Sequence, residues 1–92
     1  AISFIINCMD QDELDHYWEK LSEGGDRRSQ QCGWLKDRFG LSWQVVPVIL
    51  GDLLQDSDRT RADRVMKALL QMKKLDISAL QNAYDGKRTQ YA

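Results

Sequence analysis

Uncharged polar side chains stand in two stretches of the chain that suit β-strands, and the second of these stretches also holds a tryptophan. Ser3 and Asn7 lie in an apolar stretch near the first residue, and Gln44 directly follows Trp43 in a second stretch. Ser, Asn and Gln side chains donate and accept hydrogen bonds, and an indole ring supplies a flat apolar wall. With Trp34, these residues form the candidate ligand-binding set: Ser3, Asn7, Trp34, Trp43 and Gln44.

The other residue types that could do chemistry also have structural interpretations. His16, the one histidine, falls off the apolar stripe of its helix, which favours a solvated residue over a catalytic or metal-binding one. Cys8 and Cys32 could be neighbours if their strands pair, but a metal site needs more ligands, so buried reduced thiols are favoured. The tryptophans could instead pack in a core or a dimer interface. Basic residues over 59–74 alternate with apolar ones at helical spacing, which favours a solvated face over a phosphate site.

A β-hairpin is predicted to position the candidate residues. Its strands are expected over residues 30–36 and 41–48, joined by a turn in which Gly40 supplies a positive φ. Alternation should place Cys32 with Trp34 on one face of the first strand. Pro47 fits a strand end or an edge strand. On the second strand, one predicted face holds Leu41, Trp43, Val45 and Pro47, and the other holds Ser42, Gln44, Val46 and Val48.

The segment before the hairpin predicts a strand and a helix. Residues 2–8 are β-branched and apolar, which indicates a strand covered at least in part on both faces. Asp10 is the expected N-cap of the helix, with Glu13 in the capping-box position. Two glycines at 24–25 end the helix. Its apolar stripe would be Leu14, Tyr17, Trp18 and Leu21.

The segment after the hairpin predicts two or three helices. Residues 48–54 suit a short helical turn, and Asp58 or Thr60 should cap the next helix. Asp76 should cap the last helix, and Gly86 should close it. The resulting order, β-α-β-β followed by helices, predicts an α+β fold. The helix capped by Asp58 or Thr60 should bury Ala62, Val65, Met66, Leu69 and Met72, and leave Arg61, Arg64, Lys67 and Lys73 solvated.

Size and composition narrow the class of protein. Ninety-two residues allow one domain, and 42% hydrophobic with 29% charged residues is typical of a globular chain. A net charge of −1, from 13 basic and 14 acidic residues, argues against nucleic-acid binding. No apolar run is long enough to span a membrane and no signal-peptide pattern is visible, so no membrane partner is expected. The two cysteines favour a reduced, cytoplasmic setting.

Several motifs together resemble a known family over about residues 2–86. The chain is similar to the C-terminal half of a PhnB-like protein, in the 3-demethylubiquinone-9 3-methyltransferase-like branch of the glyoxalase/bleomycin-resistance (vicinal oxygen chelate) superfamily. The residues that carry the resemblance are Asp10-Gln11, Tyr17-Trp18-Glu19-Lys20-Leu21, Gln31-Cys32-Gly33-Trp34-Leu35-Lys36-Asp37, Phe39-Gly40, Ser42-Trp43-Gln44, Pro47 and Met72-Lys73-Lys74-Leu75-Asp76-Ile77.

The resemblance implies one βαββ(β) module of a cup-shaped, glyoxalase-like sheet. Residues 1–86 would form this module and residues 87–92 a tail. The chain starts without Met and directly with a strand, so we expect an upstream half to be missing. Since two modules make a cup, the resemblance implies a homodimer, in which the two copies could exchange elements.

The resemblance also implies a small-molecule site on the concave sheet face carrying Ser3, Asn7 and Gln44. The resemblance places Ser3 and Gln44 at positions that hold metal ligands in the metal-dependent members. Because Ser is a poor metal ligand and Gln binds metals more weakly than a carboxylate does, no metal is expected. The cofactor is unknown, and no Gly-rich loop for a methyl donor is visible. The reaction is unassigned, and whether the protein is an enzyme stays open. The alternatives are a non-catalytic binding protein of the bleomycin-resistance type, or a dimerisation module in which Gln44 is a satisfied core amide.

Overall fold

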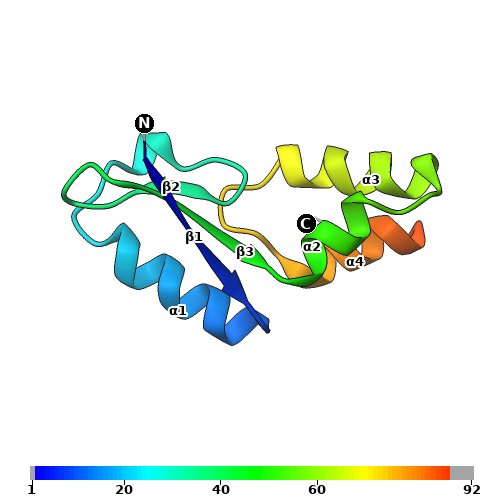
Figure 1. Cartoon of the computed structure of the whole chain (residues 1–92), viewed down its shortest axis with the longest axis horizontal. Coiled ribbons are helices and arrows are strands. Elements are labelled where there is room, and N and C mark those ends of the chain that lie inside the picture. Colours follow the sequence, from blue (N-terminus) through cyan, green and yellow to red (C-terminus); the bar gives the residue numbers. More distant parts are fainter. Residues whose placement is uncertain (1, 88–92) are drawn as a thin grey trace.

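The computed structural model describes residues 2–87 and has an α+β fold, as predicted. One half of the molecule holds a small sheet and its helix, and the later helices form the other half (Figure 1). Of the predicted tail at 87–92, only Lys87 lies within the described residues. The elements in order are β1 (Ser3–Cys8), α1 (Gln11–Ser22), the 3-10 turn η1 (Arg27–Ser29), β2 (Trp34–Lys36), β3 (Ser42–Pro47), α2 (Ile49–Leu54), α3 (Arg59–Leu70) and α4 (Ile77–Asp85).

The sheet has three strands in the order β1-β3-β2. Strand β1 runs parallel to β3, and β2 pairs antiparallel with β3 to form the predicted hairpin. Gly40 has a φ of 81° in the turn, as expected. Pro47 is the last residue of β3, opposite Cys8, so the strand-end position is confirmed. Because β3 is the central strand, the alternative of an edge strand does not apply.

The first strand of the hairpin is shorter than predicted. Cys32 and Gly33 have φ values of 52° and 87° and form a turn instead of extended strand. Their backbone N–H groups donate to the carbonyls of Met72 and Lys73, both at 2.8 Å. The prediction that Cys32 shares a strand face with Trp34 is therefore wrong. The pairing of β1 with β3 also means that the strands of the two cysteines do not pair.

Helix α1 covers one face of the sheet and forms the main core with it. Asp10 caps the helix by accepting from the Glu13 N–H at 2.8 Å, and the Glu13 carboxylate accepts from the Met9 N–H at 3.1 Å. The predicted cap is confirmed, with the Glu13 side chain reaching Met9. Tyr17 of the predicted stripe is 39% exposed, whereas Leu14 and Trp18 of the same stripe are buried. The hydrophobic core residues that α1 and the sheet bury are Cys8, Leu14, Trp18, Leu35 and Val45.

Strand β1 is much more exposed than predicted. Phe4 is 43% exposed and Ile5 is 57% exposed, and only Cys8 at the end of the strand is fully buried. The prediction of a strand covered on both faces is wrong, because β1 lies at the edge of the sheet and α1 covers a single face.

The last two helices begin where the sequence predicts, and the last one also ends there. Asp58 accepts from the N–H groups of Thr60 and Arg61, so Asp58 is the N-cap of α3. Asp76 accepts from the Ala79 N–H at 3.0 Å and caps α4, which Gly86 closes in the left-handed conformation. These local signals satisfy backbone groups that helix ends leave without partners.

Two long-range hydrogen-bond sets hold the helices together. Arg64, predicted to be solvated, donates to the carbonyls of Ala83 and Tyr84 at 2.8 and 2.9 Å and thereby closes the end of α4. The Gln11 amide donates to the Leu75 carbonyl at 3.0 Å and accepts from the Ile77 N–H at 2.8 Å. The latter set fixes the start of α4 to the start of α1.

Candidate functional site on the open sheet face

Strand register separates the candidate residues onto the two faces of the sheet. Gln44 of the central strand stands between Ile5 of β1 and Trp34 of β2, and paired residues in a sheet point to the same face. Ser3 and Asn7 share this face with Ile5, because they lie two positions away on either side. We call it the open face; its residues are Ser3, Ile5, Asn7, Trp34, Lys36, Ser42, Gln44 and Val46.

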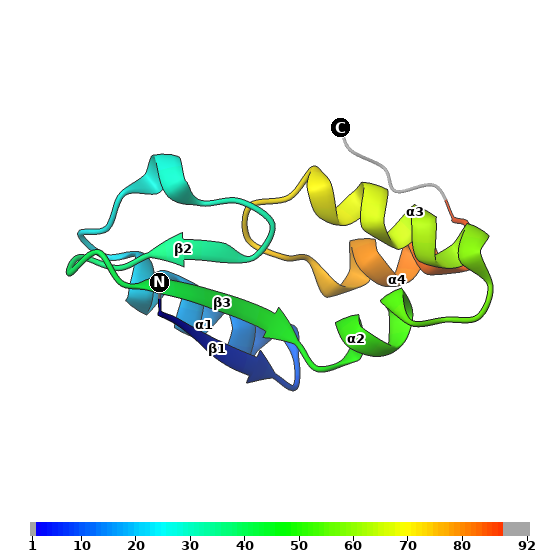
Figure 2. The same ribbon diagram turned by 45° about the horizontal axis from the view of Figure 1, so that its top comes forward.

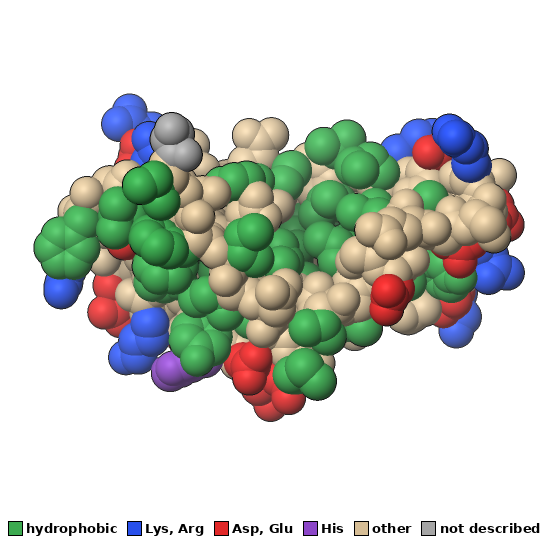
Figure 3. Space-filling view, in the orientation of Figure 1, with side chains coloured by type: hydrophobic (Ala, Val, Ile, Leu, Met, Phe, Trp, Pro, Cys, Tyr) green, Lys and Arg blue, Asp and Glu red, His purple; other side chains and the backbone are tan. Residues whose placement is uncertain are grey.

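The open face exposes apolar surface beside uncharged polar groups. Ile5 is 57% exposed and Trp34 is 38% exposed, and Gln44 between them is half-buried. In the view of Figure 2, the sheet lies in front of α1, so the helix covers its other side. Figure 3 shows hydrophobic side chains gathered over the sheet half of the molecule. The candidate set chosen from the sequence left out Ile5 and Val46.

The polar side chains of the open face have no partners within residues 2–87. None of the hydrogen bonds in that range involves the side chain of Ser3, Asn7 or Gln44. The interpretation of Gln44 as a satisfied core amide therefore finds no protein partner there. The three side chains are free to bind a ligand or a second chain.

Trp43 lies on the opposite, covered face and contacts the hairpin turn. Its indole N–H donates to the Asp37 carboxylate at 2.9 Å, and the centroids of its ring and the Phe4 ring lie 4.9 Å apart. The same carboxylate accepts from the N–H groups of Phe39 and Leu41 at 2.9 and 3.0 Å. The bond from Trp43, followed by these backbone bonds, lowers the pKa of Asp37. The structure thus gives Trp43 a role in the turn and separates it from the other candidates.

The remaining candidates are dispersed over the molecule. His16 is exposed, and the centroid of its ring lies 5.5 Å from that of Tyr17 in an edge-to-face arrangement. Cys8 is buried, and burial, then Glu13 and Asp10, raises the pKa of its thiol. Cys32 is half-buried. Within residues 2–87, no three side chains of His, Cys, Asp or Glu come together as a metal-binding group.

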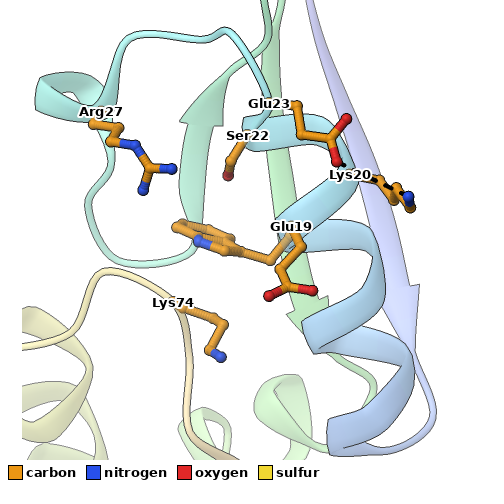
Figure 4. A pocket seen from close by; sticks show the side chains of 7 residues that line it. Glu19, Lys20, Ser22, Glu23, Arg27 and Lys74 are labelled. Carbon is orange, nitrogen blue, oxygen red and sulfur yellow. Dashed lines mark ion pairs between the residues drawn. The ribbon is translucent and has the colours of Figure 1, made fainter.

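The hollows on the described surface lie away from the open face. One, of about 490 Å³, runs along α1 and is lined mainly by charged residues (Figure 4). Another, of about 520 Å³, lies in the segment before α4 and is lined by Gln71, Met72, Lys74 and Asp76. Sequence reasoning missed the first hollow, because its charged residues come from segments far apart in the chain.

The fold and the open face define a class of protein: an α+β module with one uncovered sheet face, consistent with a glyoxalase-like module. The family model described as 3-demethylubiquinone-9 3-methyltransferase matches residues 1–46, half of the 92 residues. The chain therefore belongs to this PhnB-like family.

The extent of the match follows the fold. It includes β1, α1, η1, β2 and β3 as far as Val46, whereas α2, α3 and α4 lie outside it. The resemblance seen in the sequence was expected to reach about residue 86, so its later part has no counterpart in the match. No curated protein matches the chain. Over the described residues, none of the helices has the length and apolar character needed to cross a membrane.

Proposed function

We propose that the open face binds a small organic molecule. The observation that carries the proposal is the row Ile5–Gln44–Trp34 across the three strands. An aliphatic and an aromatic side chain flank an amide that has no hydrogen-bond partner within residues 2–87. Ligand sites in proteins combine apolar walls with a few such orienting polar groups. Ser3 and Asn7 supply further donors and acceptors at the edge of the same face.

The proposed site is completed by a second copy of the chain. On one chain the face is open to solvent, and its apolar side chains Ile5 and Trp34 are 57% and 38% exposed. Apolar side chains grouped on an exposed face favour contact with another chain. A homodimer that brings two open faces together encloses a ligand between them and removes these side chains from water.

Binding of this molecule allows two candidate functions: sequestration without a reaction, and catalysis on the bound molecule. None of Ile5, Gln44 and Trp34 titrates, so the row offers no general acid or base. A face of this kind suits a protein that sequesters its ligand, as in the bleomycin-resistance type. The family description instead names methyl transfer to a demethylated quinone, which requires a methyl donor.

Tryptophan fluorescence tests the site. The probe is the soluble ubiquinone headgroup, whose flat ring matches the family description and quenches nearby indoles. We expect saturable quenching, weakened roughly tenfold by Gln44→Ala through loss of a hydrogen bond and contact area. Gln55→Ala, which changes an exposed glutamine at the end of α2 and outside the sheet, is the matched control and should leave the affinity unchanged. Equal affinity of Gln44→Ala and the wild type would show that the site is elsewhere.

Product analysis separates the two candidate functions. The dimer is incubated with a demethylated quinol and S-adenosylmethionine, and the products are identified by mass spectrometry. Sequestration predicts a bound but unchanged quinol. A methylated product that disappears in Gln44→Ala would establish the enzyme and overturn sequestration.

A further inference from the structure

A charged pocket lies along α1, on a different part of the molecule from the open face. Its volume is about 490 Å³, and it is formed by α1, η1 and the segment before α4. Figure 4 shows Arg27 extending from η1 and Lys74 from the segment before α4, with Glu19 across from them on α1. Three parts of the chain thus bring charges of both signs to one hollow.

Three of the charges in this pocket are already paired. Lys20 lies 3.9 Å from Glu23, and Lys74 lies 3.0 Å from Asp15 beside the pocket. Arg27 and Glu19 differ from these, because neither forms an ion pair with any residue in the range 2–87. The pocket therefore holds one cation and one anion that do not neutralise each other.

A third group in the pocket is a hydrogen-bond donor without a partner. Trp18 lines the pocket and is only 7% exposed, and its indole N–H makes no hydrogen bond within the described residues. In the same range, no fully buried side-chain nitrogen or oxygen lacks a partner. The indole nitrogen must therefore keep access to solvent, and the surface that Trp18 reaches is the pocket.

We propose that this pocket binds a small zwitterion, an α-amino acid. Its carboxylate accepts from the Arg27 guanidinium and the Trp18 N–H, both of which favour an anion. Its ammonium group faces the Glu19 carboxylate at the C-terminal half of α1, where the helix dipole also favours a cation. A simple anion would leave Glu19 uncompensated, and a simple cation would leave Arg27 uncompensated. The proposal is independent of ligand binding at the open face.

Titration with L-alanine and two derivatives tests the charge requirement. Binding is followed by the indole ¹H–¹⁵N signal of Trp18 in the full chain. L-Alanine should shift this signal saturably. N-acetyl-L-alanine, which lacks the ammonium group, and L-alaninamide, which lacks the carboxylate, should each bind roughly tenfold more weakly or worse.

Charge-removing variants test the residue roles. Arg27→Gln and Glu19→Gln should each weaken L-alanine binding roughly tenfold or more, because each leaves one ligand charge without its partner. Both side chains are exposed, so the fold should survive, which circular dichroism verifies. Arg28→Gln and Asp12→Asn are the matched controls, since neither residue lines the pocket. They should leave L-alanine affinity within about twofold.

Three results would overturn the proposal. One is the absence of a saturable Trp18 shift up to the solubility limit of L-alanine. Another is equal binding of L-alanine and its two derivatives. The third is unchanged affinity in both Arg27→Gln and Glu19→Gln. Because the effect of Gln44→Ala on quinone affinity reports on the open face, failure of that test and failure of this proposal are separate results.

Discussion

The two faces of the same three-stranded sheet differ sharply in burial. On the covered face, Leu35 and Val45 are 1% and 0% exposed, and on the open face their chain neighbours Trp34 and Gln44 remain accessible. All four residues lie in strands β2 and β3, so their local backbone is the same. The difference arises from α1, which packs on one side only. Stability should therefore depend on the covered face, and binding on the open one.

Truncating adjacent residues of β2 tests this division most strongly. Leu35→Ala should lower the free energy of unfolding by about 2–5 kcal/mol, because it leaves a cavity against α1. Trp34→Ala should cost about 1 kcal/mol or less at concentrations at which the chain is monomeric. Urea denaturation measures both values. Equal losses would show that the open face is part of the folded core.

A pair of glycines tests the contact between β2 and the segment before α4. Gly33 and Gly40 both have positive φ, so Ala at either position costs about 1–2 kcal/mol for backbone strain. At Gly33 the added methyl group would also lie 3.2 Å from Leu75, whereas at Gly40 it would meet open space. Gly33→Ala should therefore destabilise more than Gly40→Ala in urea denaturation. The reverse order would mean that the turn at Cys32 and Gly33 is not packed as described.

The pH dependence of stability tests the role of Trp43 on the covered face. Because the bond from Trp43 and two backbone N–H groups lower the pKa of Asp37, its ionised form stabilises the folded state. This contribution is complete above the ordinary aspartate pKa of about 4 and is lost as the pH falls through the lower, folded-state pKa. Asp37→Asn should therefore be less stable than the wild type near neutral pH, and the difference in stability between the two proteins should narrow at low pH.

The measurement is the urea midpoint at about pH 7 and about pH 2.5. The matched control is Asp63→Asn, an exposed aspartate of α3 whose side chain makes no hydrogen bond within residues 2–87. A gap between Asp37→Asn and the wild type that is equal at both pH values would contradict the assigned role.

Local signals in the sequence predicted a large part of the fold. Asp10, Asp58 and Asp76 cap helices through their own side chains, and Gly40 and Gly86 adopt positive φ, so a few neighbouring residues decide each feature. Alternation puts Ser3 and Asn7 on one face of their strand, and the family resemblance added Gln44 to that face.

Features that depend on distant segments could not be predicted. Strand β2 begins only after Gly33, because Cys32 and Gly33 bond to Met72 and Lys73, some forty residues away in sequence. The apolar composition of β1 predicted burial, but exposure depends on which strand lies at the edge and where α1 packs. The role of Trp43 likewise required the position of Asp37 in the folded turn.

The central claim is that the open face, paired with that of a second copy, binds a small molecule. Native mass spectrometry of the chain with the soluble ubiquinone headgroup reads the assembly mass and bound ligand together. We predict a ligand-bearing dimer for the wild type and for Phe39→Lys, which changes an exposed apolar residue in the hairpin turn. Ile5→Lys should give a ligand-free monomer. A wild-type monomer, or an Ile5→Lys variant that keeps the dimer and its ligand, would contradict the claim.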